Sequence, residues 1–468
     1  MCSFLVLLKS LYQIKDKNKL LKYLKLRGPD ATNVLEHKDY VFIHNLLHIC
    51  GEKILQPFFE NNIVALLNGE IYNYDKLDNN QDNKYKSDGE CIIPLYQKYG
   101  EDFIKKLNGE FAIVIFDFNQ KIIILSADIF ATKPLFYYYD DTSKFVISSL
   151  KSTISQNITT LTEIKKIPAN TFIKLNFNNQ VLKKNHIYEF NLTQTKNTFD
   201  DFINALENAV RKRLYQNNNN NKVFITLSSG YDSGVLSLIL KNLEYKFKSY
   251  TILSKENKNT IQKRLDFDIT YQNNSFITLS KEDFKKNKQF VGNHMDSYQI
   301  KYNTFVDDNL MENSWNCKND PSSSGLNYIY KIASNENYRI YLSGHGADEI
   351  FSDYGFNGTA FAPCSKLKGI YPQNLESVFP WANFYDGCMK MFISKEEGIA
   401  SLHGIEGRYP FLDKDVVQEF IYLSPELKNN TYKAPLAYYM KKYNYPFDEN
   451  VKIGFKCNKR LIKKTTIT

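Results

Sequence analysis

The sequence predicts an α+β domain followed by an α/β domain. Short β-branched and aromatic runs bounded by Asn, Asp and Gly fill residues 1 to about 185, which is typical of stacked sheets. From about residue 199, strand-like segments alternate with helical ones, which predicts a parallel sheet with flanking helices. The 468 residues also suffice for two or three hydrophobic cores.

The individual elements follow from the same patterns. In the first domain we expect strands at 40–43, 63–67, 111–116, 122–125 and 145–147, and a helix at 90–99. In the second we expect helices at 199–214 and 234–243, and strands at 223–227, 249–253 and 338–342. These elements place the domains at 1–185 and 200–468, with a linker at 186–199.

The composition is that of a globular protein, with 43% hydrophobic and 24% charged residues. No apolar run reaches about 18 residues, so no transmembrane helix and no membrane partner are expected. The apolar run after Met1 lacks a basic segment before it and does not resemble a signal peptide. The seven cysteines are scattered without a CxxC pair, which favours a reducing compartment over disulfides or a zinc site. We therefore expect a cytoplasmic protein.

The net charge of +9 raises the question of a nucleic-acid partner. Part of the excess lies in a basic tail, formed by Lys452, Lys456, Lys459, Arg460, Lys463 and Lys464, where no acid occurs. Such a tail is either a solvated terminus or a nucleic-acid arm, and we favour the terminus. No nucleic-acid partner is expected.

Cys2 becomes the first residue if Met1 is removed, which the small second side chain favours. An N-terminal cysteine combines a thiol nucleophile with an α-amine that titrates near neutrality and can act as its base. The alternative is an ordinary cysteine in a first strand.

Two further segments of the first half bear on this choice. Asn68-Gly69 follows an apolar strand, where it forms either a hairpin turn or the amide and N–H pair of an oxyanion hole. Ser87-Asp88-Gly89-Glu90 opens a helix, and Ser87 or Asp88 could simply be its N-cap.

Taken together, the first half resembles the class II glutamine amidotransferase domain. The resemblance runs in order through Cys2, RGPD, LNGEIYNY, SDGE, LNGEFAIVIFD, DIFATKPLFYY and IKKIPANTFIKL. It implies an Ntn-type αββα fold with antiparallel sheets and a Cys2 thiol that attacks the glutamine amide and releases ammonia. It further implies that Asn68 and Gly69 hold the oxyanion. The glutamine-binding residues that it implies are Leu47, Ile49, Asn68, Gly69, Glu70 and Asp88.

One position departs from that family. Where the family reads H-x-R-L, this chain has His44-Asn45-Leu46-Leu47, so the arginine that would pair with the glutamine α-carboxylate is absent. Losing a charge-assisted hydrogen bond typically costs about 1.5–3 kcal/mol. Three outcomes are open for the glutaminase activity. The chain uses glutamine weakly, binds the α-carboxylate through another cation, or has lost this activity.

In the second half, the strand at 223–227 runs into Ser228-Ser229-Gly230-Tyr231-Asp232-Ser233-Gly234 and a helix. Backbone N–H groups at such a turn and the helix dipole bind phosphate, although any Ser/Gly loop of an α/β protein has this form. The chain has no GxxxxGK[ST] motif, which argues against a Walker-type kinase or ATPase.

The loop resembles the SGGxDS loop of enzymes that split ATP into AMP and pyrophosphate. Ser229 replaces the first glycine of the pair, and Gly234 replaces the usual final serine. The segments Leu342–Phe351, Gly404–Asp413 and Lys452–Phe455 resemble the SGEGxDE, EARxPFLD and KxGF elements of the asparagine synthetase family. With the first half, this resemblance covers nearly the whole chain and implies a PP-loop type of α/β fold.

The resemblance implies ATP and Mg²⁺ as cofactors and an acyl-adenylate mechanism. A carboxylate, aspartate in the namesake enzymes, attacks the α-phosphorus, and ammonia then displaces AMP to leave an amide. The implied nucleotide-binding residues are Leu227, Ser228, Gly230, Ser233, Ile252, Ser343 and Gly344. Asp232 and Asp348 would hold Mg²⁺, and Lys452 would neutralise charge on the phosphates. The expected partners are glutamine, aspartate and ATP, and a homodimer is the assembly that we consider.

His345 is a second departure, because the family places an acid at this position. A histidine can still exchange a proton near neutral pH, since its unperturbed pKa is about 6.5. We interpret His345 as a catalytic acid–base residue with an altered pKa. The alternative is a neutral substitution in an enzyme that has changed its substrate or lost its activity.

Four hypotheses follow. The first is a glutamine-hydrolysing asparagine synthetase, and the second is an amide-forming ligase for another carboxylate. The second hypothesis is supported by three departures from the family pattern, at Leu46, Ser229 and His345. The third is a catalytically impaired binding or regulatory descendant. The fourth, a tRNA-modifying ligase, is opposed by the amidotransferase half and by the lack of a recognisable RNA-binding module.

Overall fold

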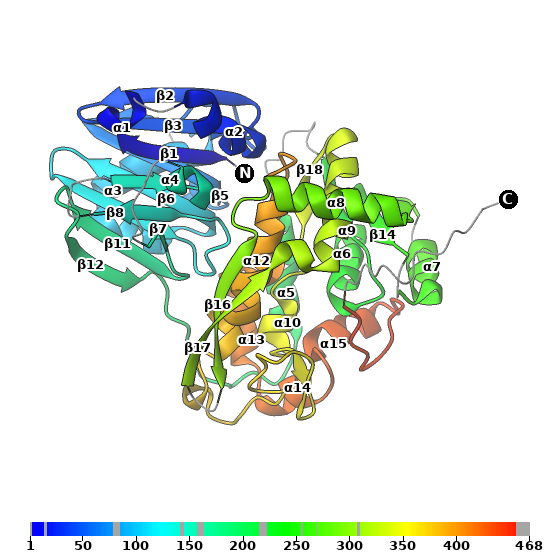
Figure 1. The fold of residues 1–468 in the computed structure, drawn as a ribbon. Coiled ribbons are helices and arrows are strands. Elements are labelled where there is room, and N and C mark those ends of the chain that lie inside the picture. Colours follow the sequence, from blue (N-terminus) through cyan, green and yellow to red (C-terminus); the bar gives the residue numbers. More distant parts are fainter. Residues whose placement is uncertain are drawn as a thin grey trace. The chain divides into compact units, whose positions relative to one another are not determined.

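The computed structural model describes residues 2–13, 16–77, 85–140, 145–156, 163–214, 222–253, 256–267, 269–306 and 309–454. The chain divides into two compact units (Figure 1). The first is built mainly on residues up to Glu189 and includes the short segment Ala400–Glu406. The second begins at Phe190 and contains most of the rest of the chain.

Two six-stranded sheets form the first unit. One has the order β10 (Lys165–Lys166), β8 (Phe136–Tyr139), β9 (Phe145–Ser148), β1 (Ser3–Leu8), β3 (Tyr40–Leu46) and β2 (Ala31–His37). The other has the order β12 (Val181–His186), β11 (Thr171–Asn176), β7 (Ile122–Ala127), β6 (Gly109–Asp117), β5 (Ile63–Ile71) and β4 (Phe58–Glu60). The strands of both pair in the antiparallel sense.

Alternation along the strands explains how the sheets stack. Val64 and Leu66 of β5 join the core between the sheets, whereas Ala65 and Leu67 face the opposite way. The outer face of this sheet packs on α3 (Ile92–Tyr99). The other sheet packs on α1 (Lys9–Gln13), α2 (Lys17–Arg27) and α4 (Lys151–Ser155). The layers are helix, sheet, sheet and helix, which confirms the predicted stacked antiparallel sheets.

A five-stranded sheet forms the centre of the second unit. Its order is β15 (Gln272–Ile277), β14 (Phe247–Ile252), β13 (Lys222–Thr226), β18 (Tyr338–Leu342) and β21 (Glu406–Arg408). The pairs β13–β14, β14–β15 and β13–β18 are parallel, which confirms the predicted α/β fold. The helices of this unit are α5 (Asp200–Leu214), α6 (Tyr231–Asn242), α7 (Lys258–Phe267), α8 (Lys281–His294), α9 (Pro321–Asn335), α10 (Ala347–Phe351), α11 (Ala382–Tyr385), α12 (Gly387–Ala400), α13 (Lys414–Tyr422), α14 (Pro425–Asn429) and α15 (Ala434–Lys442).

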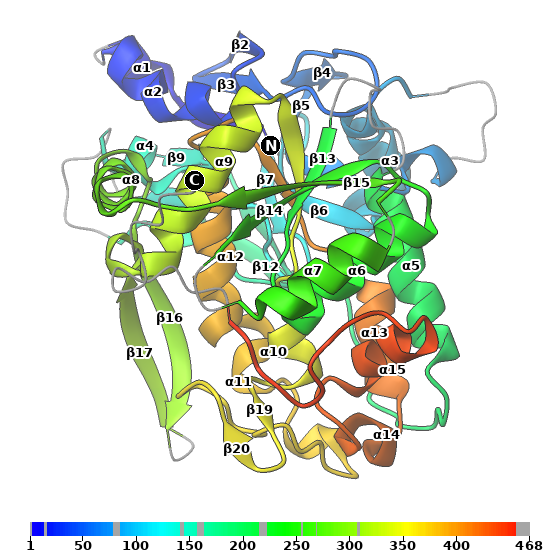
Figure 2. The same cartoon turned by 90° about the vertical axis from the view of Figure 1, so that its right-hand side faces the viewer.

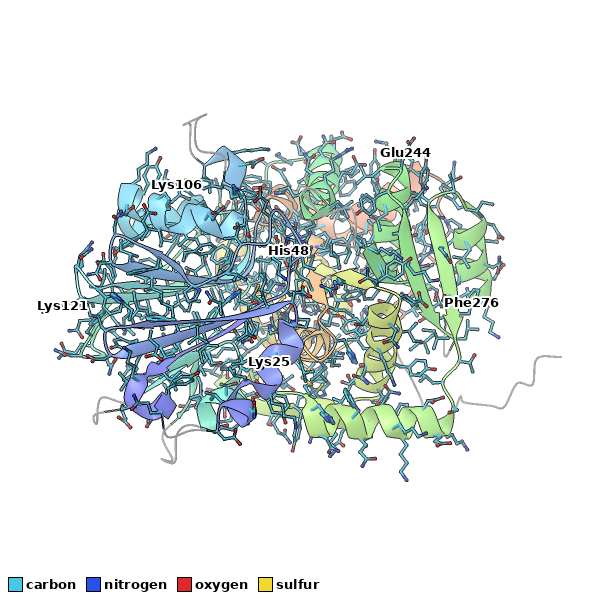
Figure 3. All side chains as sticks on the ribbon, turned by 90° about the horizontal axis from the view of Figure 1, so that it is seen from above. Lys25, His48, Lys106, Lys121, Glu244 and Phe276 are labelled. Carbon is cyan, nitrogen blue, oxygen red and sulfur yellow. The ribbon has the colours of Figure 1, made fainter. Side chains whose placement is uncertain are left out.

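The segment from residue 293 to 324 contains a long antiparallel hairpin. It is formed by β16 (Gln299–Val306) and β17 (Asn309–Asn316), which project away from the central sheet (Figure 2). A smaller hairpin joins β19 (Gly355–Phe356) and β20 (Thr359–Ala360). Polar side chains such as Lys121 and Glu244 lie at the outer margins of their units (Figure 3). Within the described part of the chain, no helix is long and apolar enough to cross a membrane.

A buried ion pair joins α5 to α13. Arg213 Nη1 donates to Asp413 Oδ2 at 2.9 Å, and the two side chains are 2% and 0% exposed. Lys212 approaches the same carboxylate to 2.9 Å. Burial alone would raise the pKa of Asp413, but the two cations lower it below its usual value.

We expect Asp413→Asn to destabilise the second unit by about 3 kcal/mol, because the variant loses the buried carboxylate that pairs with Arg213 and Lys212. Since the folded pKa is lowered, this stabilisation is present above about pH 4 and is lost as the pH falls through the folded value. The free energy of unfolding is measured by urea unfolding followed by tryptophan fluorescence, because Trp315 and Trp381 both lie in the second unit.

Asp415→Asn is the matched control. This carboxylate also pairs with Lys212, at 3.1 Å, but is 50% exposed. We expect it to cost less than about 1 kcal/mol. Equal losses in both variants would contradict the role assigned to the buried pair.

Candidate active sites

The first site is built around Cys2, which directly precedes β1 and is 7% exposed. Its thiol donates a weak hydrogen bond to Leu47 O at 3.8 Å, and Arg27 Nε donates to Cys2 O at 2.9 Å. Burial, with smaller contributions from the Glu406 and Glu70 carboxylates, raises the pKa of the thiol to about 12. The thiol is therefore protonated at neutral pH, and its reactivity depends on a base.

Asn68 and Gly69 lie inside β5, opposite Ala112 and Phe111 of β6, so the alternative of a plain hairpin turn is wrong. Gly69 has φ +130°, and a Cβ atom there would lie 1.9 Å from Glu110 O, so only glycine fits. The Asn68 side chain is fully buried, and neither its Oδ1 nor its Nδ2 has a hydrogen-bond partner among the described residues. An unpaired buried amide is costly, which fits a group that binds a ligand.

The other residues predicted to bind glutamine come from neighbouring elements. Glu70 lies at the end of β5, where the next residue, Ile71, donates its N–H to Asp88 Oδ2 at 2.8 Å. Asp88 begins a short 3₁₀ turn at Asp88–Cys91, so the N-cap is Ser87. Leu47 and Ile49 are buried at 3% and 1% exposure.

Leu46 replaces the family arginine at the end of β3. It is 7% exposed and stands opposite Ala31 of β2. Its apolar side chain offers no cation for a carboxylate.

The second site begins at the loop between β13 and α6. Gly230 is the N-cap of α6, and the Ser228 N–H donates to Ser233 Oγ at 3.0 Å. The Gly230 N–H donates to Ser228 Oγ at 3.2 Å. Strand, turn and helix N-terminus follow one another as in a phosphate-binding loop. Leu227 and Ile252, two of the predicted nucleotide-binding residues, are buried at the ends of neighbouring strands.

Both departures in this loop have local partners. Glu256 Oε2 accepts the N–H and the hydroxyl of Ser229, each at 2.6 Å. A Cβ atom at Gly234 would lie 2.7 Å from the buried guanidinium of Arg264. That guanidinium donates through Nη1 to Ser228 O and to Gly230 O at 2.6 and 2.9 Å. The chain thus stabilises the loop through Glu256 and Arg264.

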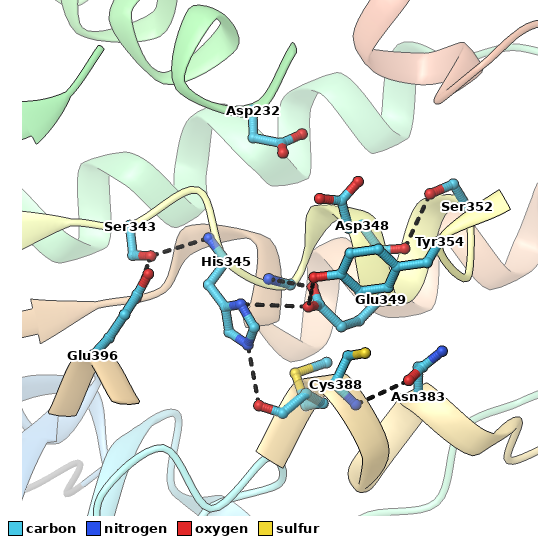
Figure 4. A network of polar contacts seen from close by, with 12 residues as sticks. Asp232, Ser343, His345, Asp348, Glu349, Ser352, Tyr354, Asn383, Cys388 and Glu396 are labelled. Atoms are coloured by element: carbon cyan, nitrogen blue, oxygen red, sulfur yellow. Dashed lines mark hydrogen bonds and ion pairs between the residues drawn. The ribbon is translucent and has the colours of Figure 1, made fainter. Parts of the chain in front are cut away.

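The predicted metal ligands Asp232 and Asp348 lie in the first turns of α6 and α10, which follow β13 and β18, and their carboxylates face one another in Figure 4. Sequence reasoning missed the cation between them. Lys433, whose side chain is 1% exposed, places Nζ 2.5 Å from Asp232 Oδ1 and 2.7 Å from Asp348 Oδ1. Lys452, predicted to act near the phosphates, pairs with Asp348 Oδ2.

The nearby charges explain why the pKa values of the two carboxylates shift in opposite directions. Burial raises the pKa of Asp232 despite Lys433. At Asp348, Lys433 and Lys452 outweigh burial and lower the pKa. Among the described residues, no three acidic, histidine or cysteine side chains form a complete metal site. Two carboxylates nevertheless fit Mg²⁺, which keeps several waters and shares substrate phosphates.

The turn after β18 holds the remaining predicted residues (Figure 4). A Cβ atom at Gly344 would lie 2.9 Å from Asp232 Cβ, so glycine allows the close approach. Ser343 Oγ accepts from the His345 N–H at 3.0 Å and donates to Glu396 Oε2 at 2.6 Å. Glu396 was not predicted, because it lies 53 residues away on α12.

The His345 imidazole is directed into the protein. Its side chain is 5% exposed, with Nδ1 3.4 Å from Glu349 Oε1 and Nε2 3.2 Å from Met389 O. Both ring nitrogens thus contact protein groups. Of the basic tail, only Lys452 lies within the described residues.

A family model described as a glutamine amidotransferase domain matches residues 1–223. A protein of Methanocaldococcus jannaschii, provisionally named asparagine synthetase [glutamine-hydrolyzing] 1, is 24% identical over 99% of this chain and 89% of its own length. Asparagine synthetase B [glutamine-hydrolyzing] of Escherichia coli is 24% identical over 88% of this chain and 73% of its own length. The chain is therefore similar to glutamine-hydrolysing asparagine synthetases over nearly its whole length, and its first half matches a glutamine amidotransferase domain.

Proposed function

We propose that the protein is a glutamine-dependent asparagine synthetase, which converts ATP, aspartate, glutamine and water into asparagine, glutamate, AMP and pyrophosphate. The observation that carries this proposal is the pairing of two sites in one chain. The first unit holds a buried cysteine at position 2, and an unpaired buried amide on Asn68. The second holds a phosphate-type loop beside Asp232 and Asp348.

In the first unit, Cys2 Sγ attacks the glutamine carboxamide once Met1 has been removed. The Cys2 α-amine takes the thiol proton, which is needed because burial keeps the thiol protonated. Asn68 Nδ2 and the Gly69 N–H donate to the oxyanion, and ammonia leaves. Water then hydrolyses the thioester on Cys2, which releases glutamate and restores the thiol. Leu47, Ile49, Glu70 and Asp88 surround the glutamine.

In the second unit, the loop from Ser228 to Ser233 holds the phosphates of ATP, and Leu227 and Ile252 contact the adenine. Ser343 and Gly344 lie beside the ribose. Mg²⁺ held by Asp232 and Asp348 would neutralise phosphate charge.

Lys452 stabilises the leaving pyrophosphate. The β-carboxylate of aspartate attacks the α-phosphorus, and ammonia then displaces AMP from the acyl-adenylate. We further propose domain limits at residues 185 and 200, a cytoplasmic location and the absence of a nucleic-acid partner. A homodimer is the assembly to test.

We expect Cys2→Ala to abolish glutamine-dependent asparagine formation and to leave ammonia-dependent formation unchanged. Asparagine and pyrophosphate are measured with ATP, Mg²⁺ and aspartate, with glutamine or ammonium as the nitrogen source. Cys50→Ala, a change at a half-buried cysteine of the same unit, is the control and should keep both activities.

A wild-type protein active only with ammonium would mean that Leu46 has disabled the glutaminase. Pyrophosphate release only with a carboxylate other than aspartate would refute the proposed acceptor. No pyrophosphate with any acceptor would refute the ligase assignment.

We expect Lys433→Met to lower the stability of the second unit by about 3 kcal/mol without Mg²⁺, because Asp232 and Asp348 then lose their shared cation. Mg²⁺ should stabilise the variant more than the wild type, since the divalent ion replaces the missing ammonium. Thermal unfolding with and without MgCl₂ measures both effects.

Lys441→Met removes an exposed lysine that pairs with Glu449 and should change neither value by more than about 1 kcal/mol. An identical Mg²⁺ response in Lys433→Met and the wild type would argue against a metal site at these two carboxylates.

A further inference from the structure

The position at which the resembling enzymes carry an acid holds His345, and the structure limits what this residue can do. Its imidazole is almost fully buried, with Glu349 beside Nδ1 and the Met389 carbonyl beside Nε2. A base must reach the proton that it removes, directly or through one water. Both ring nitrogens of His345 contact protein groups and not a site where a substrate proton could be removed. His345 is therefore suited to holding the turn in place.

A carboxylate lies close by on another element. Glu396 of α12 is partly exposed, and its Oε2 accepts from Ser343 Oγ at 2.6 Å (Figure 4). Its other oxygen has no hydrogen-bond partner among the described residues. Ser343 belongs to the turn proposed to hold the nucleotide, so Glu396 is placed next to the site of adenylate chemistry.

The charges around Glu396 leave this carboxylate without an ion-pair partner in the described part of the chain. The adjacent Lys395 is directed elsewhere, with Nζ 3.2 Å from Asp320 Oδ2 and 3.0 Å from Ser322 Oγ. Burial raises the pKa of Glu396, and Glu349 raises it further, whereas His345 and Lys395 act to lower it. A raised pKa makes the ionised carboxylate a stronger base.

We propose that Glu396 supplies the acid–base function of the synthetase site and accepts the proton that ammonia loses when it displaces AMP. His345 acts as a positioning residue. In this step the ammonia nitrogen forms a bond to the acyl carbon, and the bond from that carbon to the phosphate oxygen of AMP breaks. AMP leaves with the electron pair of that bond, and one proton passes from nitrogen to Glu396 and then to water.

This inference rests on the proposed function. Measuring the two half-reactions separately distinguishes a failure of the inference from a failure of the proposed function. Adenylation is measured as ATP–pyrophosphate exchange in the presence of aspartate, and amide formation as asparagine made from ammonium. We expect Glu396→Gln to keep exchange within about threefold of the wild type and to lower the amide rate by about 100-fold or more. Glu396→Asp should restore part of that rate.

Glu397→Gln is the matched control on the same helix. Glu397 is 2% exposed and accepts from the Tyr409 hydroxyl at 3.0 Å, away from Ser343. This variant should keep the ratio of the two half-reactions even if it loses stability, which thermal unfolding checks.

Equal losses of exchange and amide formation in Glu396→Gln would overturn the inference and assign Glu396 a structural role. A selective loss of amide formation in His345→Gln, with Glu396→Gln unaffected, would overturn it in favour of the imidazole. Absence of exchange in the wild type with every acceptor would instead refute the proposed function itself.

Discussion

The second unit depends on one buried ammonium group. Lys433 lies between Asp232 and Asp348, which begin the helices that follow two parallel strands. Without this cation, two carboxylates at such close range would repel each other in a poorly solvated site. The ammonium therefore lets the loop after β13 and the turn after β18 approach each other. Gly344 completes the approach, because a side chain there would collide with Asp232.

The first unit uses a backbone constraint for a comparable purpose. Gly69 adopts a left-handed conformation within β5, and the close approach of Glu110 O excludes any side chain. Asn68 stands beside it with a buried amide that no described residue satisfies. A strand that carries both features sacrifices local stability, which is expected where a site must stabilise a charge that develops during reaction.

Features encoded by neighbouring residues could be predicted from the sequence. The strands at 63–67 and 223–227, the helix after Gly230 and the layering of both units follow from local patterns. Lys433 and Glu396 could not be predicted, because each reaches its partners from a distant element and no short motif marks it. Asn68-Gly69 was ambiguous for a related reason, since a hairpin turn and a glycine inside a strand share the same dipeptide.

The departures from the family pattern bear on whether the protein is a decayed relative. Random loss would leave unfilled space and unpaired groups at the altered positions. Instead, Ser229 is bound by Glu256, and Gly234 makes room for the Arg264 guanidinium that supports the loop. His345 is likewise placed between protein groups, while Glu396 of α12 provides a carboxylate that contacts Ser343 of the same turn. Because each of these three changes in the second unit has a physical partner elsewhere in the chain, the synthetase site is rebuilt rather than eroded, which favours an active ligase over an inert descendant.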